Sequence, residues 1–502
     1  MNDAKIIEFE FIDYLTKMEL DQKVRELKGL RLFGYSLGDL GMSLANIFTN
    51  VFIFQYYVYT INLNSLFVSI GITFQLVIGA IFSIIFGVIV DNARPNRLGK
   101  RRPFLLYGLP IWAITTILIW TPPWKCPQDN PMFMPTAIYF WIVVIIRSIA
   151  RTLLFNVYVS MFPEQSQTIE NREKVASIRS AFSIISSTFA LMLPLIVQSL
   201  LPDPLNVKWW APSGKIMTFF IPIIGLIFTF FGVICIILIY FSVDESFYSN
   251  IHNHDIEKTT IIKAFKGLSR PARDKNFNKL VLVNFFSGVN GKAFGLLVFP
   301  FQMYVLLFVS SQYYIYIFIS IFGKFGWYFT WKAIIKKKPL LKSYVVCLIF
   351  AIVASGFDIL FLMKDLPDVI KMILYITTFS TILGSMYAFP LFGIPIMASL
   401  VNESARKMDK DNIDESLSKI SGSYYGYSSF ISTLGPAFAS IFVGSILTGE
   451  NERNPTVITL LLFSVSIFYL IALLFLRKIK FKEKKHYFIQ KFQDDNVFLE
   501  QN

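Results

Sequence analysis

Charged side chains are scarce in this 502-residue chain: they make up 16% of the residues, whereas hydrophobic residues make up 54%. Soluble domains carry about 25% charged residues, so the polar side chains here are too few to cover several soluble domains. Cysteine and histidine are rare, with three of each, and their spacing fits neither a disulfide framework nor a zinc site. We therefore expect a protein that folds in lipid, without a metal site or a cofactor.

Other absences exclude further classes of protein. The histidines (His252, His254 and His486) lack companion ligands, and no glycine-rich loop precedes Gly99-Lys100, so we expect neither an enzyme nor an ATP-driven pump. The net charge is +14, but the Lys and Arg residues lie in short clusters between apolar runs, and we expect no nucleic-acid partner. The beginning of the chain is polar and charged, which differs from a cleavable signal peptide.

What the sequence has instead is a series of long apolar runs. A hydrocarbon core about 30 Å thick requires about 20 apolar residues per helix, and backbone groups in lipid must pair within the helix. We count twelve such runs and predict an all-α integral membrane protein with twelve transmembrane helices. The predicted spans are 32–60, 64–90, 103–121, 134–162, 174–200, 214–241, 277–307, 310–332, 342–363, 369–400, 422–448 and 456–477.

The basic residues between the spans predict the orientation, because Lys and Arg concentrate in cytoplasmic loops. Most of the 47 Lys and Arg residues fall in segments that share one side with the two ends of the chain. We therefore expect both termini to be cytoplasmic and the protein to lie in the cell membrane. The opposite loops hold about five basic residues, namely Lys125, Lys208, Lys215, Lys364 and Arg453.

The longest interior polar segment divides the spans into two sets of six. A short basic turn joins the second and third spans at 91–103, and another joins the eighth and ninth at 332–339. The same feature at the same place in both halves indicates a duplicated six-helix unit. The predicted divisions are an N-terminal cytoplasmic segment 1–31, a six-helix bundle 32–241, a cytoplasmic central loop 242–276, a second bundle 277–477 and a basic tail 478–502.

Three stretches carry a family resemblance. They are the loop from Asp91 to Pro103, the stretch from Pro163-Glu164 to Arg179, and the region from Pro395 to Leu400 with Ser421–Gly426. Together they resemble motifs of the glycoside–pentoside–hexuronide (GPH) cation symporters of the major facilitator superfamily. The resemblance implies two six-helix bundles that move a sugar-like solute by alternating access.

The loop between the second and third spans is a candidate conformational latch. We expect Asp91, Arg97, Gly99, Lys100 and Arg101 to hold the two spans together in one conformation of the carrier. An alternative is that the basic residues of this loop only enforce the orientation and bind anionic lipid headgroups. Both interpretations can hold.

Cationic side chains within the spans point to a substrate site, because an ionisable group in lipid costs several kcal/mol. Arg147 and Arg151 are four residues apart and share a helix face, near the middle of the bilayer. Arginine binds carboxylate and phosphate groups, so with Lys292 of the other half the pair would form an anion-binding cavity. Two alternatives stay open: structural pairing of the arginines, and a neutral sugar site with one arginine as donor.

Five further residues are substrate candidates. The family's acidic position on the fourth span falls near Asn156, and its fifth-span arginine resembles Arg179. Tyr158, Tyr424 and Tyr425 are candidate cavity walls for stacking a sugar ring. Most other aromatic residues near span ends are expected to anchor the helices at the membrane interface.

The sequence departs from the family at the cation site. GPH symporters carry two second-span aspartates that bind the coupling cation, and the matching positions here are Gly79 and Ser83. The family's first-span acidic position falls near Ser43, one helical turn from Asp39. We therefore doubt sodium coupling and leave two options open: proton coupling through Asp39, with Ser43 beside it, and uncoupled transport.

The sequence thus predicts a secondary-active or facilitative transporter of a glycoside or sugar acid, with a small-molecule substrate and membrane lipids as its partners. One alternative is a carrier of lysophospholipids, because cavity cations suit a phosphate and Phe-rich walls suit an acyl tail. An alternative of another class is a membrane receptor without transport activity, or a lipid scramblase, on the same fold.

Overall fold

The computed structural model describes residues 25–94, 96–166, 168–246, 260–309, 312–363, 365–386, 388–408 and 413–480. Most of the predicted segments 1–31 and 478–502, the three histidines and Lys364 lie outside these residues. The described part of the chain is helical, apart from turns and one isolated bridge between Asn96 and Gly99.

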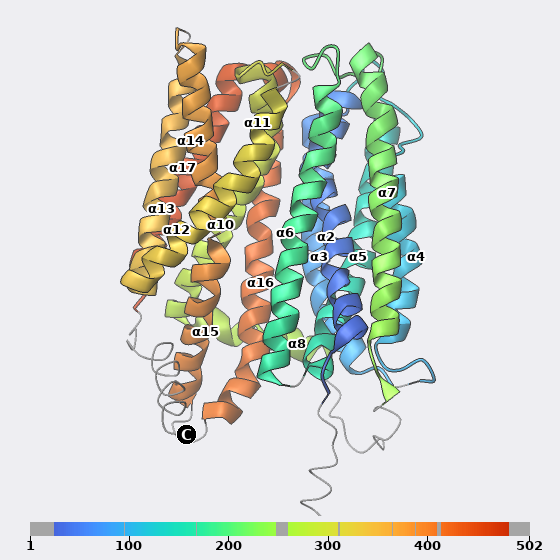
Figure 1. Cartoon of the computed structure of the whole chain (residues 1–502), viewed down its shortest axis with the longest axis vertical. Coiled ribbons are helices and arrows are strands. Elements are labelled where there is room, and N and C mark those ends of the chain that lie inside the picture. The colour runs from blue at the N-terminus through green and yellow to red at the C-terminus, as the bar shows by residue number, and fades with distance from the viewer. Residues whose placement is uncertain are drawn as a thin grey trace, which may run out of the picture.

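The first half of the chain forms a bundle of long helices that run along the long axis of the molecule (Figure 1, blue to green). Local signals place the starts of several helices: the side chains of Asn64 and Thr168 accept hydrogen bonds from the first turns of α3 and α6, as N-cap residues do. The helices are α2 (Gly29–Gln55) with the π-helical turn η1 (Tyr56–Thr60), α3 (Ser65–Asp91), α4 (Arg102–Leu118), α5 (Met134–Gln165), α6 (Ile169–Ser199) and α7 (Pro212–Ser242).

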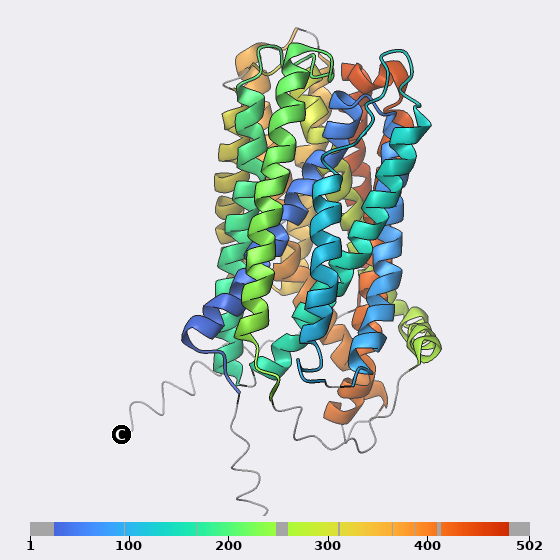
Figure 2. The same ribbon diagram turned by 90° about the vertical axis from the view of Figure 1, so that its right-hand side faces the viewer.

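The second half forms a second bundle beside the first (Figures 1 and 2). Two short helices, α8 (Ile261–Gly267) and α9 (Ser269–Arg273), precede it. Its elements are α10 (Lys275–Pro300), η3 (Phe301–Val305), α11 (Tyr313–Phe318), η5 (Ile319–Gly323), α12 (Lys324–Lys337), α13 (Leu340–Phe357), η6 (Asp358–Leu362), α14 (Asp368–Met386), α15 (Phe389–Met408), α16 (Ile413–Ile446), η7 (Gly449–Arg453) and α17 (Pro455–Arg477).

The helices match the predicted spans, with three local differences. Ten described stretches are long and apolar enough to cross a membrane, and these make the chain a multi-pass integral membrane protein. The third span is the shorter helix α4, and the eighth is built from α11, η5 and α12. The tenth span is divided into α14 and α15 just before Pro390, whose missing N–H is tolerated in the first turn of a helix but not in its interior.

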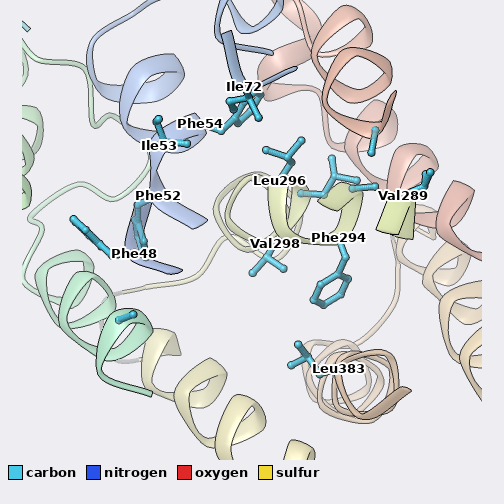
Figure 3. Close-up of a cluster of buried hydrophobic side chains, with 14 of the residues drawn as sticks. Phe48, Phe52, Ile53, Phe54, Ile72, Val289, Phe294, Leu296, Val298 and Leu383 are labelled. Atoms are coloured by element: carbon cyan, nitrogen blue, oxygen red, sulfur yellow. The ribbon is translucent and has the colours of Figure 1, made fainter. Parts of the chain in front are cut away.

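Each bundle has its own packing, and a few helices connect the two. In the first, α2 packs on α6 and α7 and α3 packs on α5, whereas in the second α10 packs on α16 and α17. Contacts between α3 and α16, α2 and α10, and α6 and α11 join the bundles. Figure 3 shows apolar side chains of α2 and α10 at this junction, where the rings of Phe52 and Phe299 lie 4.6 Å apart.

The two ends of the molecule differ in charge. We call one the basic end: it carries residues 25–28, the loop 92–101, the turn 338–339 and residues 478–480. Hydrogen bonds from Asn276 and Lys279, at the start of α10, to the backbone carbonyls of Lys480 and Lys478 tie the end of the described chain to this region. The other, the opposite end, carries the segments 61–64, 119–133, 200–211 and 447–454.

Candidate functional site

A cavity of about 640 Å³ lies between the bundles and extends from their middle to the basic end. Helices α3 and α5 form one wall and α16 forms the other, while Gly267 and Leu268, where α8 meets α9, line it at the basic end. Among the described residues that line it, Arg151 is the charged one. The polar lining residues are Asn50, Gln75, Ser83, Ser148, Arg151, Thr152, Asn156, Ser423, Ser429 and Thr433.

Small residues on two facing helices create this space. Gly79, Ser83 and Gly87 recur every four residues on α3 and therefore share one face of that helix. Ser423 and Gly426, three residues apart, likewise share one face of α16. Because none of these side chains is large, the two helices leave room for a solute between them at the basic end, although they touch farther along.

The two arginines of α5 occupy different environments. Arg151 lines the cavity, and its guanidinium carbon lies 6.0 Å from the ring of Phe155. Within the described chain its guanidinium has no ion pair or hydrogen bond. Arg147 is fully buried inside the first bundle instead, where it donates hydrogen bonds to Thr116 at 3.2 Å and to Thr49 at 3.0 Å. It does not line the cavity.

The wall beside Arg151 is neutral where the family carries acids. The amide of Asn156 donates to the backbone carbonyl of Ser83 at 2.8 Å, and the Ser83 hydroxyl donates to the Asn156 amide oxygen at 3.2 Å. Both residues line the cavity, and so does Gly79. This reciprocal pair fixes two polar groups against the lumen without supplying a carboxylate for a metal cation.

Asp39 and Arg179 form an ion pair outside the cavity lining. The hydroxyl of Tyr158 donates to the same Asp39 oxygen at 3.2 Å, and the Arg179 guanidinium carbon lies 4.8 Å from the Tyr158 ring. The three predicted residues therefore form one cluster that links α2, α5 and α6. Ser43, one turn along α2, is half-buried and does not line the cavity either.

The remaining predicted substrate residues lie near the cavity without lining it. The ammonium nitrogen of Lys292, on α10, is 3.4 Å from the backbone oxygen of Asn50, a lining residue of α2. Tyr424 donates to Asp274 at 3.3 Å, which joins α16 to the start of α10. Tyr425 is 39% exposed and does not line the cavity, although its neighbour Gly426 does.

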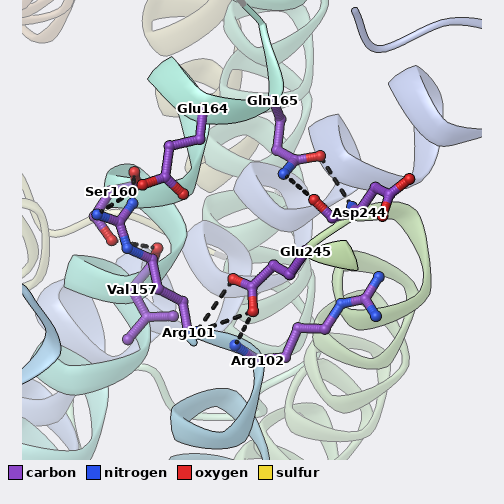
Figure 4. Close-up of polar contacts among 8 residues, drawn as sticks. All are labelled: Arg101, Arg102, Val157, Ser160, Glu164, Gln165, Asp244 and Glu245. Atoms are coloured by element: carbon purple, nitrogen blue, oxygen red, sulfur yellow. Dashed lines mark hydrogen bonds and ion pairs between the residues drawn. The ribbon is translucent and has the colours of Figure 1, made fainter. Parts of the chain in front are cut away.

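The loop between α3 and α4 is held at the basic end by two acidic residues (Figure 4). Glu245, which follows α7, accepts backbone N–H bonds from Arg101 at 3.1 and 3.0 Å and from Arg102 at 3.3 Å. The Arg101 guanidinium pairs with Glu164 of α5 at 3.1 Å and also donates to the carbonyl of Ser160. Arg101 is thus bound through both its backbone and its side chain.

The other predicted latch residues have different surroundings. Lys100 contributes a backbone N–H to the Glu245 carboxylate, while Arg97 is exposed. The backbone of Asp91 ends α3, and its side chain lies outside the described residues. Sequence reasoning missed Glu245, although an acidic pair directly after the sixth span was a usable signal. Burial raises the pKa of Glu245, and the backbone N–H donors oppose that shift.

Gly99 has a backbone conformation that this latch requires. Its φ is +105°, and a Cβ at this position would collide with the Glu245 carboxylate. We expect Gly99→Ala to destabilise the protein by about 1–3 kcal/mol, because the strain of positive φ adds to the clash. The measurement is the thermal unfolding midpoint in detergent. Gly356→Ala is the control, since a Cβ there meets nothing within 4 Å, and an equal loss in both variants would contradict the prediction.

At the opposite end the two bundles are in direct contact. The Ser65 hydroxyl of α3 donates to the carbonyl of Gly444 of α16 at 3.1 Å, and Thr73 donates to the carbonyl of Ala437 at 3.1 Å. A Cβ on Gly444 would collide with the side chain of Ser69 and lie 3.0 Å from the Ser65 carbonyl. The cavity is therefore closed at the opposite end by close packing of α3 against α16, with hydroxyl groups of α3 bonded to backbone carbonyls of α16.

Charged groups of both bundles meet at this closure. Lys208 of the first bundle donates to the carbonyl of Val58 at 3.0 Å and to the Asn62 side chain at 2.7 Å. Tyr59 donates to the backbone oxygen of Glu452 in the second bundle at 3.2 Å. Burial raises the pKa of Glu452 to about 7, opposed by the charges of Lys208 and Arg453, and burial lowers the pKa of Lys208 to about 8.

These shifts predict a pH dependence of stability. The raised pKa of Glu452 means that the folded protein holds its proton more tightly than the unfolded chain, which titrates near 4.5. The contribution of Glu452 to the free energy of unfolding is therefore complete below pH 4.5 and lost as the pH rises through about 7. Lys208 is protonated in the folded and the unfolded state over this range. We expect the thermal unfolding midpoint to fall as the pH rises from 4.5 to about 7. In the Glu452→Gln variant the midpoint should fall less over the same pH range. An unchanged slope in the variant would contradict the assignment.

Two bundles around a cavity that opens at one end define a membrane carrier of the major facilitator fold. A profile of the family described as MFS/sugar transport protein matches residues 34–479, and the chain belongs to this family. The resemblance to GPH carriers and the predicted all-α fold of two six-helix bundles are thereby confirmed. A protein described as an uncharacterized symporter of Synechocystis sp. is 30% identical over 136 residues, and the match spans 26% of this chain and 24% of that relative.

Solved transporters share the fold at low sequence identity. A mutant of the nucleoside transporter NupG superposes with a TM-score of 0.61 at 15% identity, covering 90% of this chain and 100% of that chain. A D-xylose-proton symporter superposes with a TM-score of 0.59 at 14% identity, covering 90% and 98%. The inward open xylose transporter XylE from E. coli gives 0.57 at 12% identity, covering 90% and 96%.

Proposed function

We propose that this protein is a transporter that moves a sugar-like solute across a cell membrane by alternating access. The observation that carries the proposal is the cavity between the bundles, continuous to the basic end and closed at the opposite end. Because Lys and Arg concentrate in cytoplasmic loops, the basic end is cytoplasmic, as are both termini. The bundles 32–241 and 277–477 then rock about the central site, joined by the cytoplasmic loop 242–276.

The lining of the cavity supports a hydroxylated solute that carries one anionic group. Serine, threonine, asparagine and glutamine side chains supply donors and acceptors for sugar hydroxyls, and the volume of about 640 Å³ is within the range of ligand pockets. Arg151 is positioned to bind a carboxylate or phosphate through its planar fork. A sugar acid or a hexuronide satisfies both features, whereas an acyl tail would leave many of the lining groups without partners.

The other predicted residues enter this proposal in three groups. The cavity wall near Arg151 is shaped by Asn156 and Ser83, and the contact between the bundles involves Lys292. Arg147 holds α5 against its neighbours inside the first bundle. Tyr424 and Tyr425 would reach the solute only after a rearrangement of α16, since neither lines the present cavity. We keep Asp91, Arg97, Gly99, Lys100 and Arg101 as the latch that stabilises this conformation.

Proton coupling, if present, would run through Asp39. A proton on this carboxyl would remove the negative charge that holds Arg179 and weaken the hydrogen bond from Tyr158, which joins protonation to the packing of α2 against α5 and α6. We therefore expect Asp39→Asn to abolish accumulation driven by a pH gradient while solute exchange continues. The measurement compares gradient-driven uptake with counterflow in proteoliposomes, and gradient-driven accumulation that survives in the variant would exclude Asp39 as the coupling residue.

Ligand-induced thermal stabilisation tests the substrate class. A ligand that binds only the folded protein stabilises it by about 2.7 kcal/mol at a hundredfold excess over Kd. The panel contains neutral disaccharides and pentosides, hexuronates and glucuronides, and a lysophospholipid. We expect stabilisation by the hexuronates or glucuronides. Stabilisation by the lysophospholipid alone would favour a lipid carrier, and a stabilising ligand that is bound but never transported would favour a receptor.

A further inference from the structure

A second concave site lies on the outside of the second bundle, away from the transport cavity. It is a groove of about 540 Å³ at the basic end, between the turn that joins α12 to α13 and the last residue of α17. Three cations line it: Lys338, Lys342 and Arg477. Leu341, Val345 and Val346 of α13 supply its apolar wall.

Among the described residues, no acidic side chain compensates the charge in this groove. Lys338 and Lys342 are four residues apart on the turn and the first turn of α13, and Arg477 approaches from α17. None of the lining residues is acidic, and among the described residues none of the three cations forms an ion pair. Like charges held together repel one another, so an anion that bridges them would be bound favourably.

An exposed apolar stripe leads away from the groove along α13. Phe350, Val353 and Phe357 follow Val346 at helical spacing, and they are 46%, 50% and 51% exposed. In a membrane protein such a stripe faces the acyl chains. The groove therefore joins a cationic head region at the membrane surface to a hydrophobic track that extends into the bilayer, which matches a molecule with an anionic head and long tails.

We propose that this groove binds one acidic phospholipid, with its headgroup phosphate on Lys338, Lys342 and Arg477 and its acyl chains along α13. Charge complementarity and the continuity of the groove with the apolar stripe carry the assignment. Anionic lipids are concentrated in the cytoplasmic leaflet, where the positive-inside rule places the basic end. The site is separate from the transport cavity and shares no lining residue with it.

The test is native mass spectrometry of the full-length protein titrated with phosphatidylglycerol, phosphatidylcholine or glycerol phosphate. We expect one phosphatidylglycerol to bind in preference to the other two. Each cation near an anionic surface contributes about 1 kcal/mol, roughly fivefold in affinity. The triple variant Lys338→Gln, Lys342→Gln and Arg477→Gln should therefore bind this lipid about a hundredfold more weakly.

A matched triple variant controls for the loss of net charge. Lys266→Gln, Arg273→Gln and Arg406→Gln remove three exposed cations of the basic end that lie outside the groove, and affinity for phosphatidylglycerol should be retained. The thermal unfolding midpoint of each lipid-free variant shows that it is folded. Equal weakening in both variants, equal binding of phosphatidylcholine, or equal binding of glycerol phosphate would each overturn the proposal.

Discussion

The Arg151→Ala variant is expected to lose the response to hexuronides while it remains folded. Arg151 is the charged residue of the described cavity lining, and a carboxylate brought into the cavity would have no other cation on that wall. Removing one partner of a buried, hydrogen-bonded charge pair costs about 2–5 kcal/mol, which corresponds to a rise in Kd of about 30-fold or more. The measurement is the concentration of hexuronide that gives half-maximal thermal stabilisation.

Two further variants distinguish this role from a structural one. Arg151→Lys keeps the charge but loses the planar fork, so we expect it to bind more weakly than the native protein and more tightly than Arg151→Ala. Arg147→Ala removes the hydrogen bonds to Thr49 and Thr116 and should lower stability more than affinity. If Arg151→Ala keeps the full hexuronide response, the arginine has no part in binding the solute and the anionic-substrate proposal is wrong.

The Gly444→Val variant is expected to keep its ligand and lose transport. A side chain on Gly444 would push α16 away from Ser65 and Ser69 of α3, so the opposite end could no longer close. Overpacking of this kind costs about 1–3 kcal/mol, enough to lower the population of the closed form about 5- to 150-fold. Solute uptake into proteoliposomes should fall by a similar factor, while stabilisation by ligand persists.

Cysteine labelling gives a direct readout of that opening. Thr73 lies between the bundles, where its hydroxyl bonds to the carbonyl of Ala437, and the three native cysteines are buried. A cysteine placed by Thr73→Cys should react faster with an impermeant maleimide from the opposite side when it is combined with Gly444→Val. Gly295→Val is the control, since a Cβ at that glycine meets nothing within 4 Å. Unchanged labelling and transport in the Gly444→Val protein would exclude closure at this contact.

The transmembrane architecture could be predicted from the sequence because its physical cause is local. Each apolar run must form a helix in lipid, and the runs therefore match the helices from α2 to α17. The basic loop after α3 was also recognisable, since its charges and Gly99 are contiguous in the chain. The break between α14 and α15 departs from a single long helix, for the local reason that Pro390 follows it.

The site was harder to predict because it depends on helix rotation and on partners far apart in the chain. Four-residue spacing places Arg147 and Arg151 on one side of α5, yet their long side chains reach different surroundings, one towards Thr49 and Thr116 and the other into the cavity. The pairing of Asp39 with Arg179, 140 residues apart, cannot be read from spacing. The role of small residues such as Gly79 in lining the cavity is visible only when the position of α3 relative to α16 is known.

Uptake of a radiolabelled hexuronide into proteoliposomes tests the central claim most directly. Liposomes with the native protein, with the Arg151→Ala variant and without protein are compared over a range of solute concentrations, with unlabelled neutral sugar as a competitor. The account predicts saturable uptake of the hexuronide by the native protein. The neutral sugar should inhibit this uptake only weakly, and the Arg151→Ala variant should lose it. The account would be contradicted if uptake equalled that of protein-free liposomes for every hexuronide tested. It would also be contradicted if the protein moved lipids in both directions without regard to the headgroup.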